Sequence, residues 1–495
     1  LRALGYHVDL VERLDSLGGR AQVFEKDGFR HDAGPTVITA PFMFEELFSL
    51  FDEKLSDHLE FVPVSPWYRF HFPDGSDFDY GEDMAAFEAG MARYREADIE
   101  GYRRLLEASR EIFEVGFEKL ADQPFLKFTD MLKQVPALLK LRSDLTVSQF
   151  VKKYITHPYL QQALSIHPLL VGGNPYDTTS IYALIHYLER KWGVHFCMGG
   201  TGKLVSELEK LMRRHGVGIH TGADVEEIVV SDKKVTGIKC VDGRQMDADL
   251  VVCNADPPTV YREMMPVGGK SFLRPKKIIP EALTKYSMGL YVLYFGTTRQ
   301  YPDVAHHTIW LGERFKGLLN DIFNKQIATD DFSLYLHRPT ATDPSFAPEG
   351  CDSFYILCPV PNLQGNIDWD VYGPELRDRI VKALSETIMP DLEAHVTADF
   401  WMHPGDFEKQ YRATHGAGFS IAPVFRQSAW FRYHNQDPDI DNLYFVGAGT
   451  HPGAGLPGVL SSAKALEKMI PAQSHIQSEI QSQGGAADFL AEAGE

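Results

Sequence analysis

A glycine-rich segment near the carboxyl end of the chain carries the residues that most clearly suggest chemistry. It runs Asn442-Leu-Tyr-Phe-Val-Gly-Ala-Gly-Thr-His-Pro-Gly-Ala-Gly-Leu-Pro-Gly-Val459. The pattern predicts an apolar strand, a tight turn and then a helix, and the first amides of a helix have no partner within it. Such amides bind anionic groups or a carbonyl oxygen of a cofactor. Few purely structural needs explain so many glycines, so we expect this segment to bind a ligand.

A second group of residues near the amino end suggests a dinucleotide site. The first residues predict a helix that ends at Gly5 and then a strand over Tyr6–Glu12. Glu12, at the end of this strand, is followed by Gly18, Gly19 and Arg20. A carboxylate at the end of such a strand accepts hydrogen bonds from ribose hydroxyls, and paired glycines let the backbone approach a pyrophosphate. Arg20 adds positive charge there. The alternative interpretation is that these residues form an ordinary strand and turn, with the Arg20 side chain in solvent.

A third segment, Gly28-Phe-Arg-His-Asp-Ala-Gly-Pro-Thr36, predicts a tight turn at Gly34 and Pro35. Asp32 and Thr36 offer polar contacts beside it. Glu12, Gly18 to Arg20 and Asp32 to Thr36 together resemble the start of the FAD-binding amine oxidase and phytoene desaturase superfamily. The glycine-rich carboxyl-terminal segment resembles the signature of bacterial phytoene desaturases, and further matches extend from Leu1 to about Lys468.

The resemblance implies FAD as the cofactor, and it implies no metal. The cofactor-binding residues that it implies are Glu12, Gly18, Gly19, Arg20, Asp32, Gly34, Pro35, Thr36, Val225, Gly449, Thr450, His451, Gly453, Gly455, Pro457, Gly458 and Val459. In the family a G-x-G-x-x-G segment precedes these residues. It is absent here, so we expect a domain truncated at its amino terminus that retains FAD weakly.

The family reaction removes two hydrogens from neighbouring carbons of a polyene. One leaves formally as hydride, which a flavin accepts and a side chain cannot. The resemblance therefore implies FAD-dependent desaturation of phytoene to neurosporene-type or lycopene-type carotenoids, with oxygen or a quinone as the electron acceptor. Asp130 corresponds to a family acid near the substrate, and the alternative is a solvated carboxylate on a helix.

Two other functions remain open from the sequence. One is a different flavoenzyme on the same scaffold, either a carotenoid isomerase or oxygenase or a relative of the amine oxidases. The other is not an enzyme: a flavin-free carotenoid-binding fragment.

Composition excludes some classes of partner. The net charge of −19 argues against nucleic acid. The five cysteines include no C-x-x-C pair and no zinc-like spacing, which favours reduced thiols in the cytoplasm. For His306 and His307 we expect a polar loop rather than a metal pair, because neighbouring residues of a strand point to opposite faces.

The predicted fold is α/β, with a Rossmann-like FAD-binding domain interleaved with a mixed-sheet substrate domain and a helical region. Short strands are expected on both sides of the Asp242-Gly243 turn and in the runs Gly289–Phe295 and Ser353–Cys358. The expected divisions are 1–62, 198–272 and 425–470 for the FAD-binding domain, 63–90, 155–197 and 273–424 for the substrate domain, 91–154 for the helical region, and 471–495 for a disordered tail.

The helical region includes a basic and apolar stretch that predicts contact with a membrane surface. No apolar run reaches the length of about 18 residues that a span requires. Between Pro124 and Lys153 the local net charge is +4, from Lys127, Lys133, Lys140, Arg142, Lys152 and Lys153 against Asp130 and Asp144. The interleaved apolar residues are Phe125, Leu126, Phe128, Leu132, Leu138, Leu139 and Leu141. We expect peripheral association with the inner face of the cell membrane, and the alternative is an ordinary amphipathic core helix.

Overall fold

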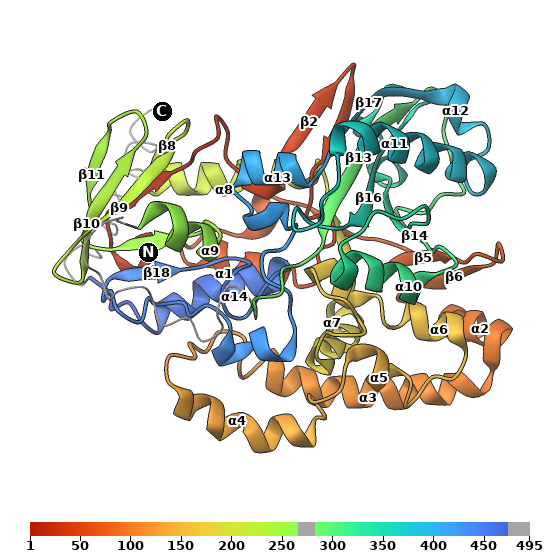
Figure 1. The fold of residues 1–495 in the computed structure, drawn as a ribbon, viewed down its shortest axis with the longest axis horizontal. Helices are drawn as coiled ribbons and strands as arrows, with labels where there is room; N and C mark the ends of the chain where they lie inside the picture. The colour runs from red at the N-terminus through yellow and green to blue at the C-terminus, as the bar shows by residue number, and fades with distance from the viewer. Residues whose placement is uncertain (266–282, 474–495) are drawn as a thin grey trace, which may run out of the picture.

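The computed structural model describes residues 1–265 and 283–473 (Figure 1). Two sheet-containing parts lie side by side in Figure 1, and a layer of helices lies along the lower edge of both. The predicted division at residues 272 and 273 and residues 474–495 of the predicted tail fall outside the described residues.

The first part, on the left of Figure 1, combines segments from the start, middle and end of the chain. Two parallel pairs join distant segments: β1 (Asp9–Val11) pairs with β8 (Gly218–His220), and β12 (Val251–Cys253) pairs with β18 (Leu443–Phe445). An antiparallel sheet lies beside them, formed by β9 (Val225–Ser231), β10 (Lys234–Cys240) and β11 (Gln245–Asp247). The helices of this part are α1 (Phe42–Ser49), α8 (Gly200–Arg214), α9 (Pro257–Thr259) and α14 (Leu456–Glu467).

Local sequence signals place several boundaries in this part correctly. A short 3₁₀ helix, Arg2–Leu4, ends at Gly5, whose φ of 90° is the left-handed conformation expected of a helix-terminating glycine. The expected hairpin at Asp242-Gly243 joins β10 to β11. The strand expected over Tyr6–Glu12 is shorter and covers Asp9–Val11.

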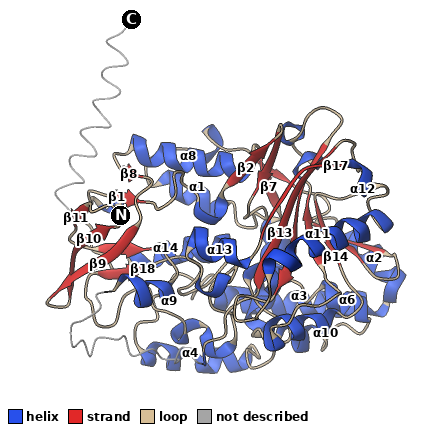
Figure 2. Ribbon diagram, turned by 45° about the horizontal axis from the view of Figure 1, so that its top comes forward, coloured by secondary structure: helices blue, strands red, loops and turns tan. Residues whose placement is uncertain are grey.

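The second part is built on a mixed seven-stranded sheet with the order β17-β13-β16-β15-β14-β5-β6. Its strands are β5 (Tyr68–His71), β6 (Asp77–Tyr80), β13 (Gly289–Thr297), β14 (His307–Trp310), β15 (Leu334–His337), β16 (Asp352–Val360) and β17 (Val396–Met402). Every residue of β13 is buried, because helices and loops cover both faces of the sheet at this strand (Figure 2). The two strands expected at Gly289–Phe295 and Ser353–Cys358 are neighbours here as β13 and β16 (Figure 1). In their register Tyr294 lies opposite Tyr355.

Among the described residues, four further strands and four helices complete this half of the molecule and connect it to the first part. The strands are β2 (Val23–Lys26), β3 (Phe29–Asp32), β4 (Phe61–Pro63) and β7 (His195–Cys197), and the helices are α10 (Phe315–Asn320), α11 (Trp369–Glu386), α12 (Leu392–His395) and α13 (Pro404–Tyr411).

The helical layer comprises α2 (Met84–Arg95), α3 (Ala97–Gly116), α4 (Phe128–Lys140), α5 (Val147–Val151), α6 (Pro158–Ala163) and α7 (Leu184–Trp192). The long helix α3 packs on α7 and buries Tyr102, Leu105 and Ile112 along one face, as its amphipathic pattern requires. The buried Asp98 carboxylate accepts hydrogen bonds from the amides of Thr156 and His157 and thereby joins α3 to the start of α6.

Within the described residues, no helix is long and apolar enough to cross a bilayer. All five cysteines are free thiols.

The environment expected for His306 and His307 was wrong. Neither residue lies in a polar loop, since only 4% of His306 and 0% of His307 is exposed to solvent. His307 is the first residue of β14, whereas His306 precedes the strand. The alternation rule therefore does not apply to this pair, and the rings lie close together.

Candidate active site

A continuous cavity of about 1410 Å³ runs between the first part and the seven-stranded sheet. One end is lined by the glycine-rich segment and by the amino-terminal residues that suggest a dinucleotide site. The other end is lined mainly by apolar side chains of the helical layer and of the sheet, among them Phe117, Leu120, Met131, Leu169 and Leu334. This volume exceeds the range of about 300–1,000 Å³ that is usual for a pocket holding one small ligand.

The glycine-rich segment has the strand, turn and helix that its sequence predicts. It leaves β18 at Phe445 and enters α14 at Leu456, and no side chain caps the helix at Gly455. Gly453 has a φ of 137°, and a Cβ on Gly458 would lie 2.6 Å from the carbonyl oxygen of Gly453. Only glycine tolerates this approach, so the uncapped amides of α14 come up to the cavity wall.

Most of the expected residues in this segment line the cavity, namely Gly449, His451, Gly453, Gly455, Pro457, Gly458 and Val459. Thr450 does not line it. Thr450 is fully buried, and its hydroxyl donates a hydrogen bond to the carbonyl oxygen of Gly447 at 3.0 Å. Its side chain therefore stabilises the turn.

The amino-terminal residues meet the same end of the cavity. Glu12, Gly18, Gly19, Arg20, Gly34, Pro35, Thr36 and Val225 all line it. The Glu12 carboxylate is oriented by the amide of Leu14, which donates to Oε1 at 2.8 Å. The carbonyl oxygen of Val225 accepts a hydrogen bond from Arg412 at 3.1 Å.

Arg20 brings a buried positive charge to this wall. Its Nε is buried and has no hydrogen-bond partner among the described residues. Burial lowers the pKa of Arg20, while the charges of Asp256 and Tyr411 act in the opposite direction. A buried guanidinium nitrogen without an acceptor is expected beside a site that takes an anion.

Asp32 and Asp130 do not line the cavity. Asp32 Oδ1 accepts a hydrogen bond from the amide of Thr201 at the start of α8, at 2.9 Å. Asp130, in the first turn of α4, lies 3.3 Å from Nζ of Lys133 at the protein surface. The geometry thus gives Asp32 a helix-capping contact and leaves Asp130 on a solvated face.

Arg432 organises the glycine-rich segment, and no sequence pattern indicates this role. Its side chain is 1% exposed and donates hydrogen bonds to the carbonyl oxygens of Thr450, Ala448, Ile421 and Gln427 at 2.9, 2.6, 3.2 and 3.3 Å. Two of these acceptors belong to the turn between β18 and α14. The guanidinium therefore fixes the turn to the preceding loop.

His451 joins this turn to the helical layer. Its Nε2 donates to the carbonyl oxygen of Leu120 at 3.2 Å, and its ring packs edge-on against Phe125 with centroids 4.9 Å apart. Burial lowers the pKa of His451 to about 4. The neutral imidazole thus holds the chain between α3 and α4 against the glycine-rich segment.

A buried carboxylate lies at the apolar end, and sequence reasoning missed it. Glu189 of α7 is 0% exposed and lines the cavity. Its Oε1 accepts a hydrogen bond from the Tyr68 hydroxyl and its Oε2 accepts one from Nε2 of His167, both at 2.9 Å. Burial raises the pKa of Tyr68 well above its ordinary value, and the negative charge of Glu189 adds a smaller effect in the same direction. The hydroxyl therefore stays protonated.

The residues that line this end of the cavity are chemically suited to bind FAD. The adenosine half of a dinucleotide requires a carboxylate for the ribose and a positive, backbone-lined wall for the pyrophosphate. Glu12, Arg20 and Gly18–Gly19 supply these groups at one end of the cavity. The uncapped start of α14 supplies amides for a flavin carbonyl.

The profile of the Flavin containing amine oxidoreductase family matches residues 1–465. A phytoene desaturase (lycopene-forming) of Pseudescherichia vulneris is 47% identical over 477 residues, which cover 95% of each chain. The corresponding enzyme of Pantoea ananas is 46% identical and covers 94% of each chain. A phytoene desaturase (neurosporene-forming) of Rhodobacter capsulatus is 39% identical, over 95% of this chain and 90% of that one.

Solved structures with little sequence similarity share the fold. Putrescine oxidase bound to putrescine matches with a TM-score of 0.59 at 13% identity, over 97% of this chain and 95% of that chain. Cyclohexylamine oxidase from Brevibacterium oxydans matches with a TM-score of 0.57 at 13% identity, over 97% and 96% of the two chains. The α/β fold with interleaved sheets and helices is therefore the fold of flavin-dependent amine oxidases.

Replacing Arg432 by Met should weaken FAD binding at least tenfold. The substitution leaves buried carbonyl oxygens without donors, each at a cost of about 1–3 kcal/mol, and a loss of 1.4 kcal/mol in binding is already tenfold. Titration of apoprotein with FAD, followed by flavin fluorescence, measures the change.

The matched control is Arg426→Met, because Arg426 lies in the same loop and is exposed. It should bind FAD like the unmodified protein. Equal FAD affinities for the two variants would show that Arg432 does not organise the site.

Proposed function

Because the chain belongs to the flavin containing amine oxidoreductases, and among them to the phytoene desaturases, we propose that it is an FAD-dependent desaturase that converts phytoene to a lycopene-type carotenoid. One observation carries the proposal: the end of the cavity that fits FAD continues without a break into an apolar end. A hydrocarbon in that apolar end lies beside the flavin rather than in a separate pocket.

The apolar end is suited to a long hydrocarbon. Burial of hydrocarbon contributes about 0.8 kcal/mol per CH₂ group, so an uninterrupted apolar wall gives both affinity and alignment. The Tyr68 and Glu189 side chains are among the few polar groups there, and the Tyr68 hydroxyl donates a hydrogen bond to the Glu189 carboxylate. Water has few partners along this wall, which protects a developing positive charge on the polyene.

When bound, FAD supplies a hydride acceptor, which no side chain of the chain can provide. The chain must supply the acceptor for the proton that leaves the neighbouring carbon. We assign this role to Glu189. Its carboxylate has about four lone-pair sites, and the contacts with Tyr68 and His167 occupy two of them.

Position supports Glu189 over the other carboxylates of the cavity wall. Those among the described lining residues are Asp9, Glu12, Asp224, Asp247, Asp249 and Asp256. All of them lie on elements of the first part, around the end that fits FAD. Asp130, which the family resemblance suggests, lies outside the cavity.

Association with a membrane surface follows from the solubility of the substrate and from the surface of α4. In Figure 1 this helix lies at the lower edge of the molecule. Phe128, Leu132 and Leu139 are 47%, 51% and 60% exposed. On the other side of the same segment, Phe125 and Met131 are buried and line the cavity. Segment 125–140 therefore separates the apolar end of the cavity from the outside.

The charges around α4 favour an anionic leaflet. Lys127, Lys133, Lys140 and Arg142 are exposed beside the apolar side chains. Of the other apolar residues expected to face the membrane, Leu126 is exposed and Leu141 is buried, whereas the side chain of Leu138 is outside the described set. Because anionic lipids are concentrated in the cytoplasmic leaflet, we propose peripheral binding at the inner face of the cell membrane. Oxygen or a membrane quinone would then reoxidise the flavin.

Incubation of the FAD-loaded protein with phytoene in liposomes tests the function. We expect a coloured product whose absorption moves to longer wavelength with each added double bond, ending at a lycopene-type spectrum. The same protein without FAD should give no product. Absence of colour after reconstitution with FAD and with either oxygen or quinone would contradict the proposal.

Replacing Glu189 by Gln should lower the turnover number by about 10²–10⁴-fold, the usual contribution of a positioned proton acceptor. FAD content should stay unchanged, because Glu189 lies at the other end of the cavity. Glu118→Gln is the control, since Glu118 forms an exposed ion pair with Lys191. A Glu189→Gln enzyme that turns over as fast as the control would exclude the assignment.

Reversing the charges of Lys133, Lys140 and Arg142 to Glu should weaken binding to anionic vesicles at least tenfold, because each basic residue near such a surface contributes about 1 kcal/mol. Co-sedimentation with vesicles measures the binding. The control reverses Lys233, Lys234 and Arg244, which are exposed on the β9–β10–β11 sheet. Equal sedimentation of the two triple variants would place the membrane contact elsewhere.

A further inference from the structure

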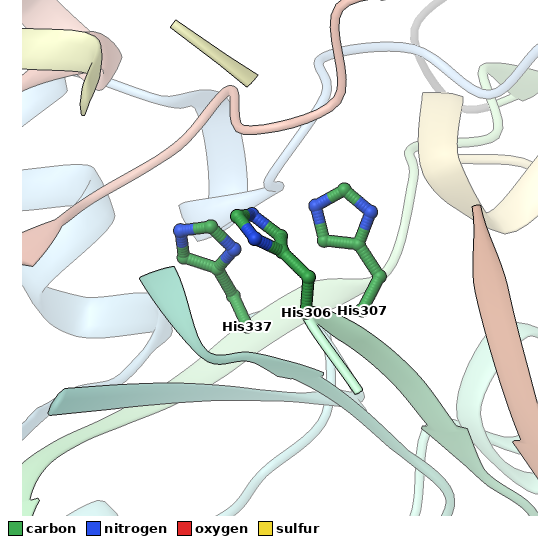
Figure 3. Close-up of side chains that lie close together, drawn as sticks. All are labelled: His306, His307 and His337. Atoms are coloured by element: carbon green, nitrogen blue, oxygen red, sulfur yellow. The ribbon is translucent and has the colours of Figure 1, made fainter. Parts of the chain in front are cut away.

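Three histidines form a buried cluster at one end of the paired strands β14 and β15 (Figure 3). His307 lies directly opposite His337 in the antiparallel pair, and His306 immediately precedes His307. The exposed fractions of His306, His307 and His337 are 4%, 0% and 0%. One ring nitrogen from each lies within 4.8 Å of the others. Among the residues that the structure describes, no other group of histidine, cysteine and carboxylate side chains is arranged in this way.

Two of the rings are held on one side by a hydrogen bond, and the third faces a carboxylate. Nδ1 of His307 donates to the carbonyl oxygen of Trp67 at 3.1 Å, and Nδ1 of His306 hydrogen-bonds with the Thr342 hydroxyl at 2.6 Å. Nε2 of His337 lies 3.7 Å from Oδ2 of Asp32. A carbonyl, a hydroxyl and a carboxylate are the groups that usually orient metal-binding histidines through their second nitrogen.

The remaining nitrogens have no hydrogen-bond partner. Nε2 of His306, Nε2 of His307 and Nδ1 of His337 are buried and have no hydrogen-bond partner in the described part of the chain, and Nε2 of His337 has only the Asp32 carboxylate near it, at 3.7 Å. A buried polar atom without a partner is destabilising, and three together at one place require an occupant. The three free nitrogens are also the ones left available when the other nitrogen of each ring carries the proton.

The rings are in the protonation state that a metal requires. Burial lowers the pKa of His306 and of His307 well below the ordinary value, and neighbouring imidazoles act in the same direction. Burial also lowers the pKa of His337, although Asp32 opposes the shift. All three imidazoles are therefore neutral at neutral pH, with a lone pair free for coordination.

We propose that His306, His307 and His337 bind one divalent transition-metal ion, with zinc as the representative, through Nε2, Nε2 and Nδ1 respectively. Zinc binds imidazole at about 2.0–2.1 Å, so ligand nitrogens around a tetrahedral ion lie roughly 3.4 Å apart. Small rotations of the rings bring the cluster to that spacing. The Asp32 carboxylate offsets part of the positive charge.

The site has a structural role, because none of the three histidines lines the cavity. Asp32 also caps α8 through Thr201, so the ion would brace β14 and β15 of the large sheet against the first part of the molecule. Aromatic side chains surround the cluster. The ring centroids of Phe196 and His306 are 4.8 Å apart, and those of Tyr355 and His337 are 5.1 Å apart. The ion takes no part in the proposed desaturation.

Metal analysis of full-length, FAD-loaded protein, purified without a polyhistidine tag, tests the proposal. After dialysis against EDTA and addition of zinc, we expect one tightly held zinc per chain by plasma mass spectrometry and a higher Tm. Cobalt(II) in place of zinc should give the visible absorption of an ion bound by three imidazole nitrogens. His306→Gln with His337→Gln should lose the stoichiometric ion.

Two further variants make the outcome decisive. His7→Gln with His220→Gln removes surface histidines beside Asp9 and should retain the ion. Thr342→Val keeps all three ligands, removes only the partner of His306, and should weaken zinc binding about 10–100-fold even if the double ligand variant does not fold. Less than stoichiometric zinc in the unmodified protein, or zinc retained unchanged by the ligand variant or by Thr342→Val, would overturn the proposal.

Discussion

The buried guanidinium of Arg432 fixes the position of the glycine-rich turn, and the rest of the site depends on that position. We propose that the turn comes close to bound FAD, which excludes side chains and leaves its carbonyl oxygens without regular partners. Arg432 supplies donors to two of them and to two carbonyls of the preceding loop. His451 then attaches the same turn to the chain between α3 and α4, so the flavin end and the apolar end of the cavity are positioned together.

The continuity of the cavity explains why helices accompany a nucleotide-binding fold. A hydrocarbon substrate cannot diffuse through water at a useful concentration, so we propose that one wall of the apolar end faces a lipid surface. Segment 125–140 has this character, with Phe125 and Met131 inside and Leu132 and Leu139 outside. The polar groups left inside are few and mutually satisfied, and Glu189 is held by Tyr68 and His167.

Local patterns predicted the elements better than the contacts between them. The Gly5 helix end, the Asp242-Gly243 hairpin and the strands around Tyr294 and Tyr355 depend on neighbouring residues and were predicted correctly. The contacts of Arg432 and Glu189 depend on segments distant in sequence, so no spacing could indicate them. The environment of His306 and His307 was predicted wrongly because strand alternation was assumed for a residue before the strand, and because His337 joins the cluster from β15.

The central claim is that FAD and the hydrocarbon share one cavity, so that electrons pass directly from substrate to flavin. Mixing the FAD-loaded protein with phytoene-containing vesicles, without oxygen or quinone, tests this claim most directly when the absorbance of flavin and polyene is recorded together. The oxidised flavin absorbance should disappear as the polyene absorbance grows, with about one double bond formed per flavin. A flavin that stays oxidised while the polyene lengthens, or while phytoene remains unchanged, would contradict the account.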